Sequence, residues 1–283
     1  MKIILGKTAG FCYGVKRAVD GAIKEINEIP KVQCLGEIVH NKQVVNDLKN
    51  KGIEFIENIQ QANKPTIIRA HGVPKEVYTY AQNNNIEIID YTCPNVLKIH
   101  KIIEEYSKNE YFIILCGSET HPENVGSISH CKSNYFIIEL PEDTKNAVKK
   151  IKELNVNKIL LIAQTTYSIE KFEQIQKELI QSLDENIKIV VKNTICKATE
   201  LRQEETEMLA KHADYMIIIG GKNSSNTKKL YDIASKNCKN SICIENKEEL
   251  NIEEVKKYEK IGVMAGASTP EESIRAVISE IYN

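Results

Sequence analysis

The chain has 283 residues, of which 42% are hydrophobic and 27% charged, a composition typical of a globular protein long enough for two or three domains. Its net charge of −1 argues against a broad nucleic-acid surface, and no apolar run approaches the roughly 20 residues of a membrane-spanning helix. The first residues, MKIILGK, are too short for a secretory signal. We therefore expect a cytoplasmic protein whose eight cysteines are thiols or metal ligands rather than disulfides.

The first predicted strand, residues 2–5, leads into GFCYGV, where Cys12 precedes a predicted helix with apolar residues at the 3.6-residue period from Val15 to Ile26. A helix N-terminus favours negative charge and therefore a thiolate at Cys12. Short β-branched runs then alternate with amphipathic stretches. They predict strands at residues 32–36, 66–70, 86–90, 111–116, 135–139, 158–163, 187–191, 215–220, 241–245 and 260–265. Several are apolar on both faces, which predicts an α/β fold of parallel sheets covered by helices.

A strand–cysteine–helix junction occurs three times, at Cys12, Cys93 and Cys196. In each case a polar residue lies 28 positions after the cysteine, just beyond the next predicted strand. These residues are His40, His121 and Ser224. A later strand in each third ends at a second polar loop. These loops hold His71, Thr165 and Ser268, at 59, 72 and 72 positions from the cysteine. The repeat predicts three homologous domains related by a pseudo-threefold axis around a central cavity.

The predicted domains are residues 13–93, 94–196 and 197–283. The last third matches the other two in length only if the N-terminal segment, residues 1–12, is counted with it. We therefore expect residues 1–12 to contribute a strand to the sheet of the third domain. In parallel α/β sheets, ligands bind beyond the carboxyl ends of the strands, where all nine polar and cysteine positions lie.

Three cysteines without a fourth equivalent suit either a zinc ion with an open position or a [4Fe–4S] cluster with one iron that lacks a cysteine. Each cysteine taken alone could equally be a small buried residue, and the shared junction argues against that interpretation. The other five cysteines need no special role. Cys34 and Cys116 lie in strand patterns and are expected in the core.

The polar loops suggest an anion site. Side chains of His, Ser and Asn and the backbone N–H groups at helix starts together bind phosphate or diphosphate. The loop GGKNSSN is the best example, although NSSN alone is more often a helix cap. It does not match the nucleotide-binding phosphate loop. In THPENVG, Glu123 is placed to donate a proton, or else is a solvated residue in the first turn of a helix.

Nine motifs in order resemble the 4-hydroxy-3-methylbut-2-enyl diphosphate reductase family. They are GFCYGV, EIVHN, AHGV, TCP, HPE, QTT, IC-A-T, KNSSN and AGAS, and they extend from residue 10 to about residue 270. The resemblance implies the last reaction of the methylerythritol phosphate route to isoprenoids. In this reaction, (E)-4-hydroxy-3-methylbut-2-enyl diphosphate is reduced with two electrons to isopentenyl and dimethylallyl diphosphate. The three-lobed α/β fold of the family agrees with the three thirds of this sequence.

The resemblance also implies roles for individual residues. Glu123 is the proton source with Thr165 as its partner, and Gln164 shapes the pocket. The implied ligands of a [4Fe–4S] cluster are Cys12, Cys93 and Cys196. The residues implied to hold the diphosphate are His40, His71, Ser224, Asn226 and Ser268, with Ser225 and His121 nearby. Electrons are expected from a ferredoxin or flavodoxin, because no flavin or nicotinamide motif is seen.

Two other classes of function fit part of the pattern. A zinc hydrolase acting on a phosphate ester shares the three-cysteine site but would be colourless and active in air. A non-catalytic iron–sulfur sensor would hold a cluster without substrate-dependent reoxidation. Iron content and colour after anaerobic purification separate the first class from a reductase, and an assay with the hydroxymethylbutenyl diphosphate separates the second.

Overall fold

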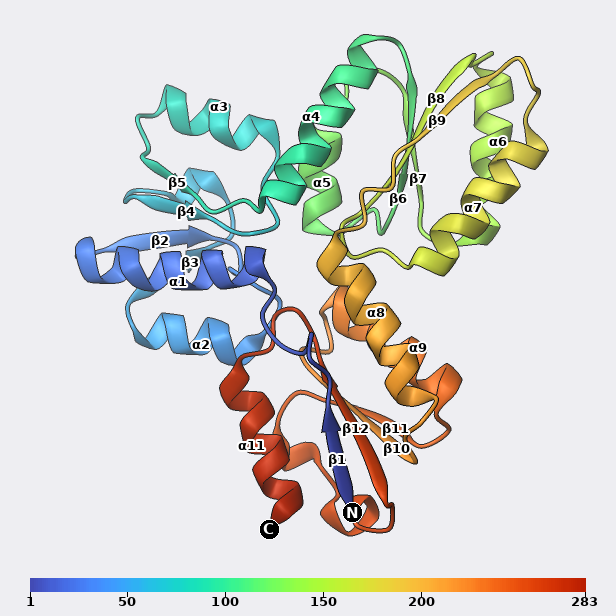
Figure 1. The fold of residues 1–283 in the computed structure, drawn as a ribbon. Helices are drawn as coiled ribbons and strands as arrows, with labels where there is room; N and C mark the ends of the chain where they lie inside the picture. Colours follow the sequence, from blue (N-terminus) through green and yellow to red (C-terminus); the bar gives the residue numbers. More distant parts are fainter. The chain divides into compact units, whose positions relative to one another are not determined.

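The computed structural model describes residues 1–283 and contains three four-stranded parallel sheets with helices between their strands (Figure 1). This confirms the predicted α/β class. The chain divides into two compact units. Unit 1 comprises Met1–Pro30, Glu37–Ile53 and Lys197–Asn283, and unit 2 comprises Lys31–Gly36 and Glu54–Cys196. The three domain boundaries expected from the sequence stay a prediction. No helix has both the length and the apolar character needed to span a bilayer.

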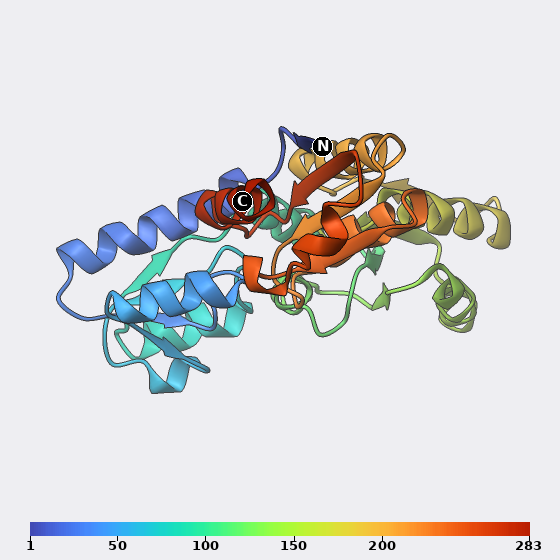
Figure 2. The same cartoon turned by 90° about the horizontal axis from the view of Figure 1, so that it is seen from below.

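Unit 1 contains one sheet with the strand order β1-β12-β10-β11. Its strands are β1 (Lys2–Leu5), β10 (Tyr215–Ile219), β11 (Ser241–Ile244) and β12 (Lys260–Ala265). β1 pairs in parallel with β12 although the two strands lie at opposite ends of the chain (Figures 1 and 2). The helices of the unit are α1 (Tyr13–Glu28), α2 (Lys42–Asn50), α8 (Lys197–Ala210), α9 (Ser225–Asn237), α10 (Ile252–Val255) and α11 (Glu271–Tyr282), with a 3-10 turn at Lys247–Glu249.

Unit 2 contains two sheets, with the strand orders β3-β2-β4-β5 and β7-β6-β8-β9. The strands of the first sheet are β2 (Val32–Leu35), β3 (Ile53–Ile56), β4 (Thr66–Ile68) and β5 (Ile88–Asp90). Those of the second are β6 (Phe112–Cys116), β7 (Tyr135–Ile138), β8 (Lys158–Ala163) and β9 (Lys188–Val191). The helices are α3 (Lys75–Asn83), α4 (Pro94–Lys108), α5 (Pro122–Ile128), α6 (Thr144–Glu153) and α7 (Ile169–Ser182), with 3-10 turns at Ile59–Gln61 and Pro141–Asp143.

Central strands bury both of their faces, as expected for parallel sheets. In β6, Ile114 packs into the core on the side of α6 and α7, whereas its neighbours Ile113 and Leu115 pack on the side of α4. In β10, Ile217 faces α11, and Met216 faces α8 and α9. This packing leaves the strand ends as the places where polar side chains can gather.

The three sheets share one topology. In each, the second strand in chain order lies at one edge, followed by the first, the third and the fourth. In unit 1, β1 takes the place of the fourth strand. The fourth strands are thus β5, β9 and β1, and each runs into one of the three cysteines predicted to bind metal.

Candidate active site

The three cysteines occupy equivalent positions in their sheets. Cys12 and Cys93 are the N-cap residues of α1 and α4, and Cys196 directly precedes α8. The backbone N–H of each cysteine donates to a carbonyl in the loop that follows the third strand of its own sheet. These bonds join Cys12 to Ala267 (3.2 Å), Cys93 to Ala70 (3.0 Å) and Cys196 to Thr165 (3.0 Å). Each cysteine is therefore tied to the loop that carries a predicted polar site residue.

None of the eight cysteines forms a disulfide, and the three junction cysteines are half-buried. Cys34 and Cys116 are fully buried in the core, which confirms the prediction for both. Burial raises the pKa of the Cys34 thiol to about 12, although the nearby Arg69 opposes the shift. Burial also raises the pKa of the Cys116 thiol strongly. These two thiols stay protonated and act as small core residues.

Three polar loops meet within unit 1. The hydroxyl of Ser268, after β12, donates to the backbone carbonyl of His40 at 3.2 Å. The same carbonyl lies close to Gly221, which follows β10. A Cβ atom at Gly221 would lie only 2.6 Å from the His40 carbonyl oxygen, so any side chain there would clash. Ser224 N–H donates to the carbonyl of Gly221, and its side chain caps α9. The structure therefore brings together His40, Ser224 and Ser268, three of the residues predicted to bind phosphate.

Asn226, in the first turn of α9, is 3% exposed, and neither its amide nitrogen nor its carbonyl oxygen has a hydrogen-bond partner. A buried side-chain amide without partners is costly, and such groups usually mark a place where a ligand or water binds. Ser225 is half-buried and accepts a hydrogen bond from Lys229 Nζ at 2.7 Å. Asn226 is therefore the group in this loop that is best prepared to receive a polar ligand.

In unit 2 the predicted proton donor is held by its predicted partner. Glu123 is 2% exposed, so it is not a solvated residue at the start of a helix. Its two carboxyl oxygens accept from the backbone N–H and the hydroxyl of Thr165, each at 2.6 Å. His121 caps α5 by accepting from the Glu123 N–H at 3.2 Å, and its ring lies edge-on to that of His71 at 5.5 Å. Four predicted site residues thus form one contiguous group.

Comparison with known proteins identifies the family. Residues 3–282 match the family described as LytB protein. The chain belongs to the LytB family. A 4-hydroxy-3-methylbut-2-enyl diphosphate reductase of Thermoanaerobacter sp. (strain X514) is 42% identical over 99% of this chain and 96% of its own length. A protein of the same name from Clostridioides difficile (strain 630) is 39% identical over the whole of both chains.

Solved structures agree with the family. A structure described as (E)-4-hydroxy-3-methyl-but-2-enyl diphosphate reductase, the terminal enzyme of the non-mevalonate pathway, has a TM-score of 0.71 and 38% identity. It is matched over 99% of this chain and 98% of its own length. The E-1-hydroxy-2-methyl-but-2-enyl-4-diphosphate reductase of Plasmodium falciparum has a TM-score of 0.91 at 28% identity, over 99% of this chain and 88% of that one.

Asn124 and Gln164 brace the Glu123 group of this LytB protein; Gln164 was already implied by the resemblance, whereas Asn124 was not foreseen from the sequence. Asn124 Nδ2 donates to the Ser118 carbonyl at 2.8 Å and to Gln164 Oε1 at 3.0 Å. Gln164 Nε2 in turn donates to the Thr166 hydroxyl at 2.8 Å. A side chain at Gly117 would collide with both amides, so the loop after β6 requires glycine there. The two amides thereby fix the first turn of α5 against the loop after β8.

Two further histidines, His100 and His130, form a stacked pair beside the loop that carries His71. The rings of His100 and His130 stack at 4.4 Å with an interplanar angle of 22°. His100 is buried, and its ring would touch a side chain placed at Gly72, beside His71. Burial lowers the pKa of His100 to about 4, and His130 adds to the shift. Burial also lowers the pKa of His130. Both rings are therefore neutral at physiological pH.

These depressed pKa values predict a loss of stability in mild acid. Between pH 6.5 and about 4, the unfolded chain binds a proton at His100 that the folded chain does not, so the free energy of unfolding falls as pH falls. Over this whole range the loss amounts to at most about 3.5 kcal/mol, since each pKa unit is worth about 1.4 kcal/mol. Urea unfolding at pH 7 and pH 5 measures the part of the loss above pH 5, at most about 2 kcal/mol. A His100→Phe variant, which keeps a stacking ring, should show a smaller difference between the two values.

The exposed His212 provides the control for this comparison. His212→Phe should lose as much stability between pH 7 and pH 5 as the unaltered protein does. Equal losses in the His100→Phe variant and the unaltered protein would contradict the assignment of the effect to His100.

Proposed function

We propose that this chain is a 4-hydroxy-3-methylbut-2-enyl diphosphate reductase. In this reaction the allylic diphosphate takes up two electrons and two protons and loses its hydroxyl group as water. The products are isopentenyl diphosphate and dimethylallyl diphosphate, which would make this reaction the terminal step of the non-mevalonate pathway. The observation that carries the proposal is the match to reductases of this name over essentially the whole length of both chains.

We infer that Cys12, Cys93 and Cys196 ligate a [4Fe–4S] cluster with one iron that lacks a cysteine. Three thiols at equivalent helix N-termini, without a fourth, fit this donor set, because a helix N-terminus stabilises the thiolates that ligate iron. The remaining cysteines do not share this position. When bound, the cluster would supply the electrons one at a time and a Lewis-acidic iron.

The diphosphate would be held by the side chains that the family resemblance implies. These are Ser224 and Asn226 at the start of α9, together with His40 and Ser268, and Ser225 lies beside them. His71 and His121 would contribute imidazole N–H donors. The support is strongest for Asn226, whose buried amide would gain in the complex the partners that it lacks in the structure.

Glu123 would deliver the proton that leaves with the hydroxyl group. The Thr165 hydroxyl can donate to an ionised Glu123, and it can accept from a protonated one. The 2.6 Å contact between them is therefore compatible with both protonation states, while the backbone N–H of Thr165 fixes the other carboxyl oxygen. This arrangement keeps the carboxyl group in one place through a catalytic cycle. Burial of Glu123 also limits the access of bulk water.

Two features of the proposal rest on the sequence analysis alone. One is a separate protein as electron donor, a ferredoxin or flavodoxin, and the other is the cytoplasmic location. Both stay predictions. The sequence contains no motif typical of a flavin or nicotinamide site.

One anaerobic experiment tests the function. The protein is purified without oxygen, its iron is counted, and it is mixed with (E)-4-hydroxy-3-methylbut-2-enyl diphosphate and reduced methyl viologen. We expect a brown protein with about four iron atoms per chain, oxidation of the viologen only when substrate is present, and both isomeric products. Release of phosphate without any reductant would instead support a zinc hydrolase. A cluster that is never reoxidised by substrate would support a sensor.

Replacing Asn226 should separate substrate binding from stability. Asn226→Leu removes two buried polar atoms that have no partner, so the free energy of unfolding of the ligand-free protein should stay equal or rise by about 1 kcal/mol. Substrate affinity should fall at least tenfold, because two hydrogen bonds to the diphosphate are lost. Thermal unfolding and calorimetric titration with the substrate measure the two quantities.

Asn237→Leu, at the other end of α9, is the matched control. The Asn237 side chain donates only to the Ile233 carbonyl of its own helix, so substrate affinity should not change in this variant. Unchanged affinity in Asn226→Leu as well would remove Asn226 from the binding site.

A further inference from the structure

The segment between β1 and Cys12 is held in place by a helix almost 200 residues away in the sequence. Arg202 of α8 is 3% exposed, and its guanidinium group reaches two carbonyls of this segment. Arg202 Nε donates to the Thr8 carbonyl and Nη2 to the Gly10 carbonyl, each at 2.8 Å. One buried side chain thereby fixes two peptide groups that lie within four residues of Cys12.

One turn later on α8, Glu205 completes the contact. Its carboxylate accepts from the backbone N–H groups of Lys7 at 2.7 Å and Thr8 at 2.8 Å, and from the Thr8 hydroxyl at 2.5 Å. Burial alone would raise the pKa of Glu205, but the hydrogen bonds from Thr8 and Lys7 outweigh it and lower the pKa. Charge-assisted hydrogen bonds of this kind are the stronger ones in proteins. Donors and acceptors of the segment are thus both satisfied from a single helix.

The other two cysteine junctions are shorter and need no such helix. Only two residues separate β5 from Cys93, and there Asp90 accepts from the Thr92 N–H at 2.7 Å. Four residues separate β9 from Cys196, and the Thr194 side chain bonds to the backbone of Ala163 in the adjoining strand. The segment before Cys12 is the longest of the three, with six residues between Leu5 and Cys12.

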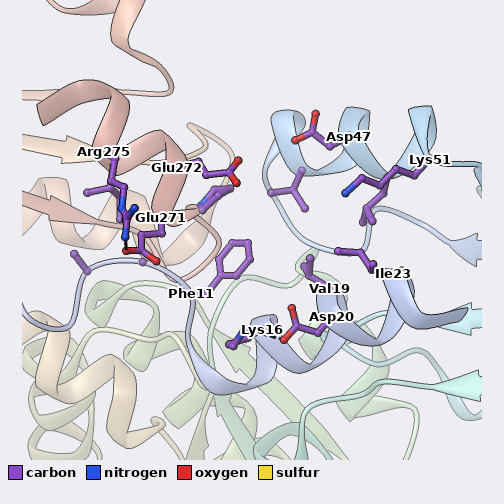
Figure 3. A pocket seen from close by; sticks show the side chains of 16 residues that line it. Phe11, Lys16, Val19, Asp20, Ile23, Asp47, Lys51, Glu271, Glu272 and Arg275 are labelled. Atoms are coloured by element: carbon purple, nitrogen blue, oxygen red, sulfur yellow. Dashed lines mark hydrogen bonds and ion pairs between the residues drawn. The ribbon is translucent and has the colours of Figure 1, made fainter. Parts of the chain in front are cut away.

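The segment also borders a cavity, although Ala9 packs against the core cluster that includes Ile274 of α11. Ala9, Gly10 and Phe11 border a cavity of about 600 Å³ in unit 1, whose other walls come from α1, α2 and α11. Figure 3 shows the Phe11 ring pointing into this space, between Val19 of α1 and Glu271 of α11. Gly10 has a φ of +98°, a conformation that only glycine adopts without strain. Packing of the segment on the cavity side is incomplete, so its hydrogen bonds to α8 add a restraint that this packing does not supply.

We propose that Arg202 and Glu205 are positioning residues that hold Cys12 in its ligating position before any cofactor is bound. A loop fixed in advance loses less conformational entropy when a ligand binds, so preorganisation favours binding. The role of Cys12 as a cluster ligand rests on the proposed function, whereas the restraint on Cys12 can be measured in cluster-free protein.

The test compares individual cysteines within one molecule. Cluster-free protein is treated with iodoacetamide, and the alkylation rate of each cysteine is followed by mass spectrometry. In Arg202→Met, the Cys12 rate should rise about tenfold, whereas those of Cys93 and Cys196 should not change. Arg202→Lys, which keeps the charge but can reach fewer carbonyls, should fall between this variant and the unaltered protein. Partial rescue of this kind is not expected from simple loss of side-chain volume.

Two further variants keep the result interpretable. Arg275→Met removes an exposed arginine that pairs with Glu271 in the same unit, and it should leave the Cys12 rate unchanged. Glu205→Gln keeps the shape of the carboxylate, and it should speed hydrogen exchange at the amides of Lys7 and Thr8 together with Cys12 alkylation. Buried Cys116 reports global unfolding. An unchanged Cys12 rate, or an equal rise at Cys116 in both Arg202→Met and Glu205→Gln, would overturn the proposal.

Anaerobic reconstitution with iron and sulfide gives a second readout. In the Arg202 variants, the visible absorbance of the cluster should bleach several-fold faster in air than in the unaltered protein. If the unaltered protein takes up no iron, the proposed function fails while the alkylation result still stands. If the unaltered protein is an active reductase and the Cys12 rates do not differ between variants, only the present inference fails.

Discussion

We expect Glu123→Gln to lower turnover about 100- to 10,000-fold, the range typical of a removed proton donor. The structure explains why this substitution is suitably mild. The glutamine oxygen can keep the bond from the Thr165 N–H, and the new amide can donate to the Thr165 hydroxyl, which accepts equally well. Geometry and burial are thus preserved, and only the transferable proton is lost. Steady-state assays with reduced methyl viologen measure turnover, and calorimetry measures binding of the substrate.

The matched control for this prediction is Glu119→Gln, four residues earlier, in the loop that leads into α5. Glu119 is exposed, and its replacement should leave turnover unchanged. Substrate affinity should stay within about threefold in Glu123→Gln, because the carboxyl group acts on the leaving hydroxyl rather than on the diphosphate. Near-normal turnover in this variant would remove Glu123 from the chemistry, and a large loss of affinity would assign it to binding instead.

The architecture could be predicted from the sequence because each third contains β-branched runs typical of buried strands and a strand–cysteine–helix junction. Each of the eleven strands expected from β-branched runs overlaps an observed strand, and β1 pairs with β12 at the edge of the sheet in unit 1. The expectation was incomplete at β3, Ile53–Ile56, where the sequence IEFI contains a charged residue and is only four residues long. Such a segment forms a strand because of the neighbouring strand that it pairs with, and its own sequence pattern does not predict it.

The local part of the candidate site could also be predicted. Strand ends in a parallel sheet gather at one edge, so a polar residue that follows a buried strand is a reasonable candidate, as at Glu123 and Thr165. The contacts that support these residues could not be predicted, because they depend on the tertiary fold. Asn124 meets Gln164 across 40 residues, and Arg202 meets Gly10 across 192. No spacing in a single sequence indicates such pairs.

Cys93→Ser is expected to abolish both the cluster and the activity, and to do so without unfolding the chain. A free serine hydroxyl is not deprotonated at neutral pH and is a much poorer iron ligand than a thiolate. Cys93 is the N-cap of α4 and makes no capping hydrogen bond, whereas serine is among the best N-cap residues. The free energy of unfolding of the cluster-free variant should therefore be equal to that of the unaltered protein or higher by up to about 1 kcal/mol.

Iron analysis and thermal unfolding after anaerobic reconstitution distinguish these effects. The iron content should fall from about four atoms per chain to a small residual amount, and turnover should fall below detection. Cys131→Ser is the control, since the half-buried Cys131 thiol donates only to nearby Ser133 and lies at none of the three junctions. A Cys93→Ser protein that keeps its iron and its turnover would contradict the ligand assignment. A helix start that improves when its metal ligand is removed would mean that the cysteine is retained for ligation at some expense to local stability. The buried amide of Asn226 at the start of α9 suggests the same compromise in unit 1.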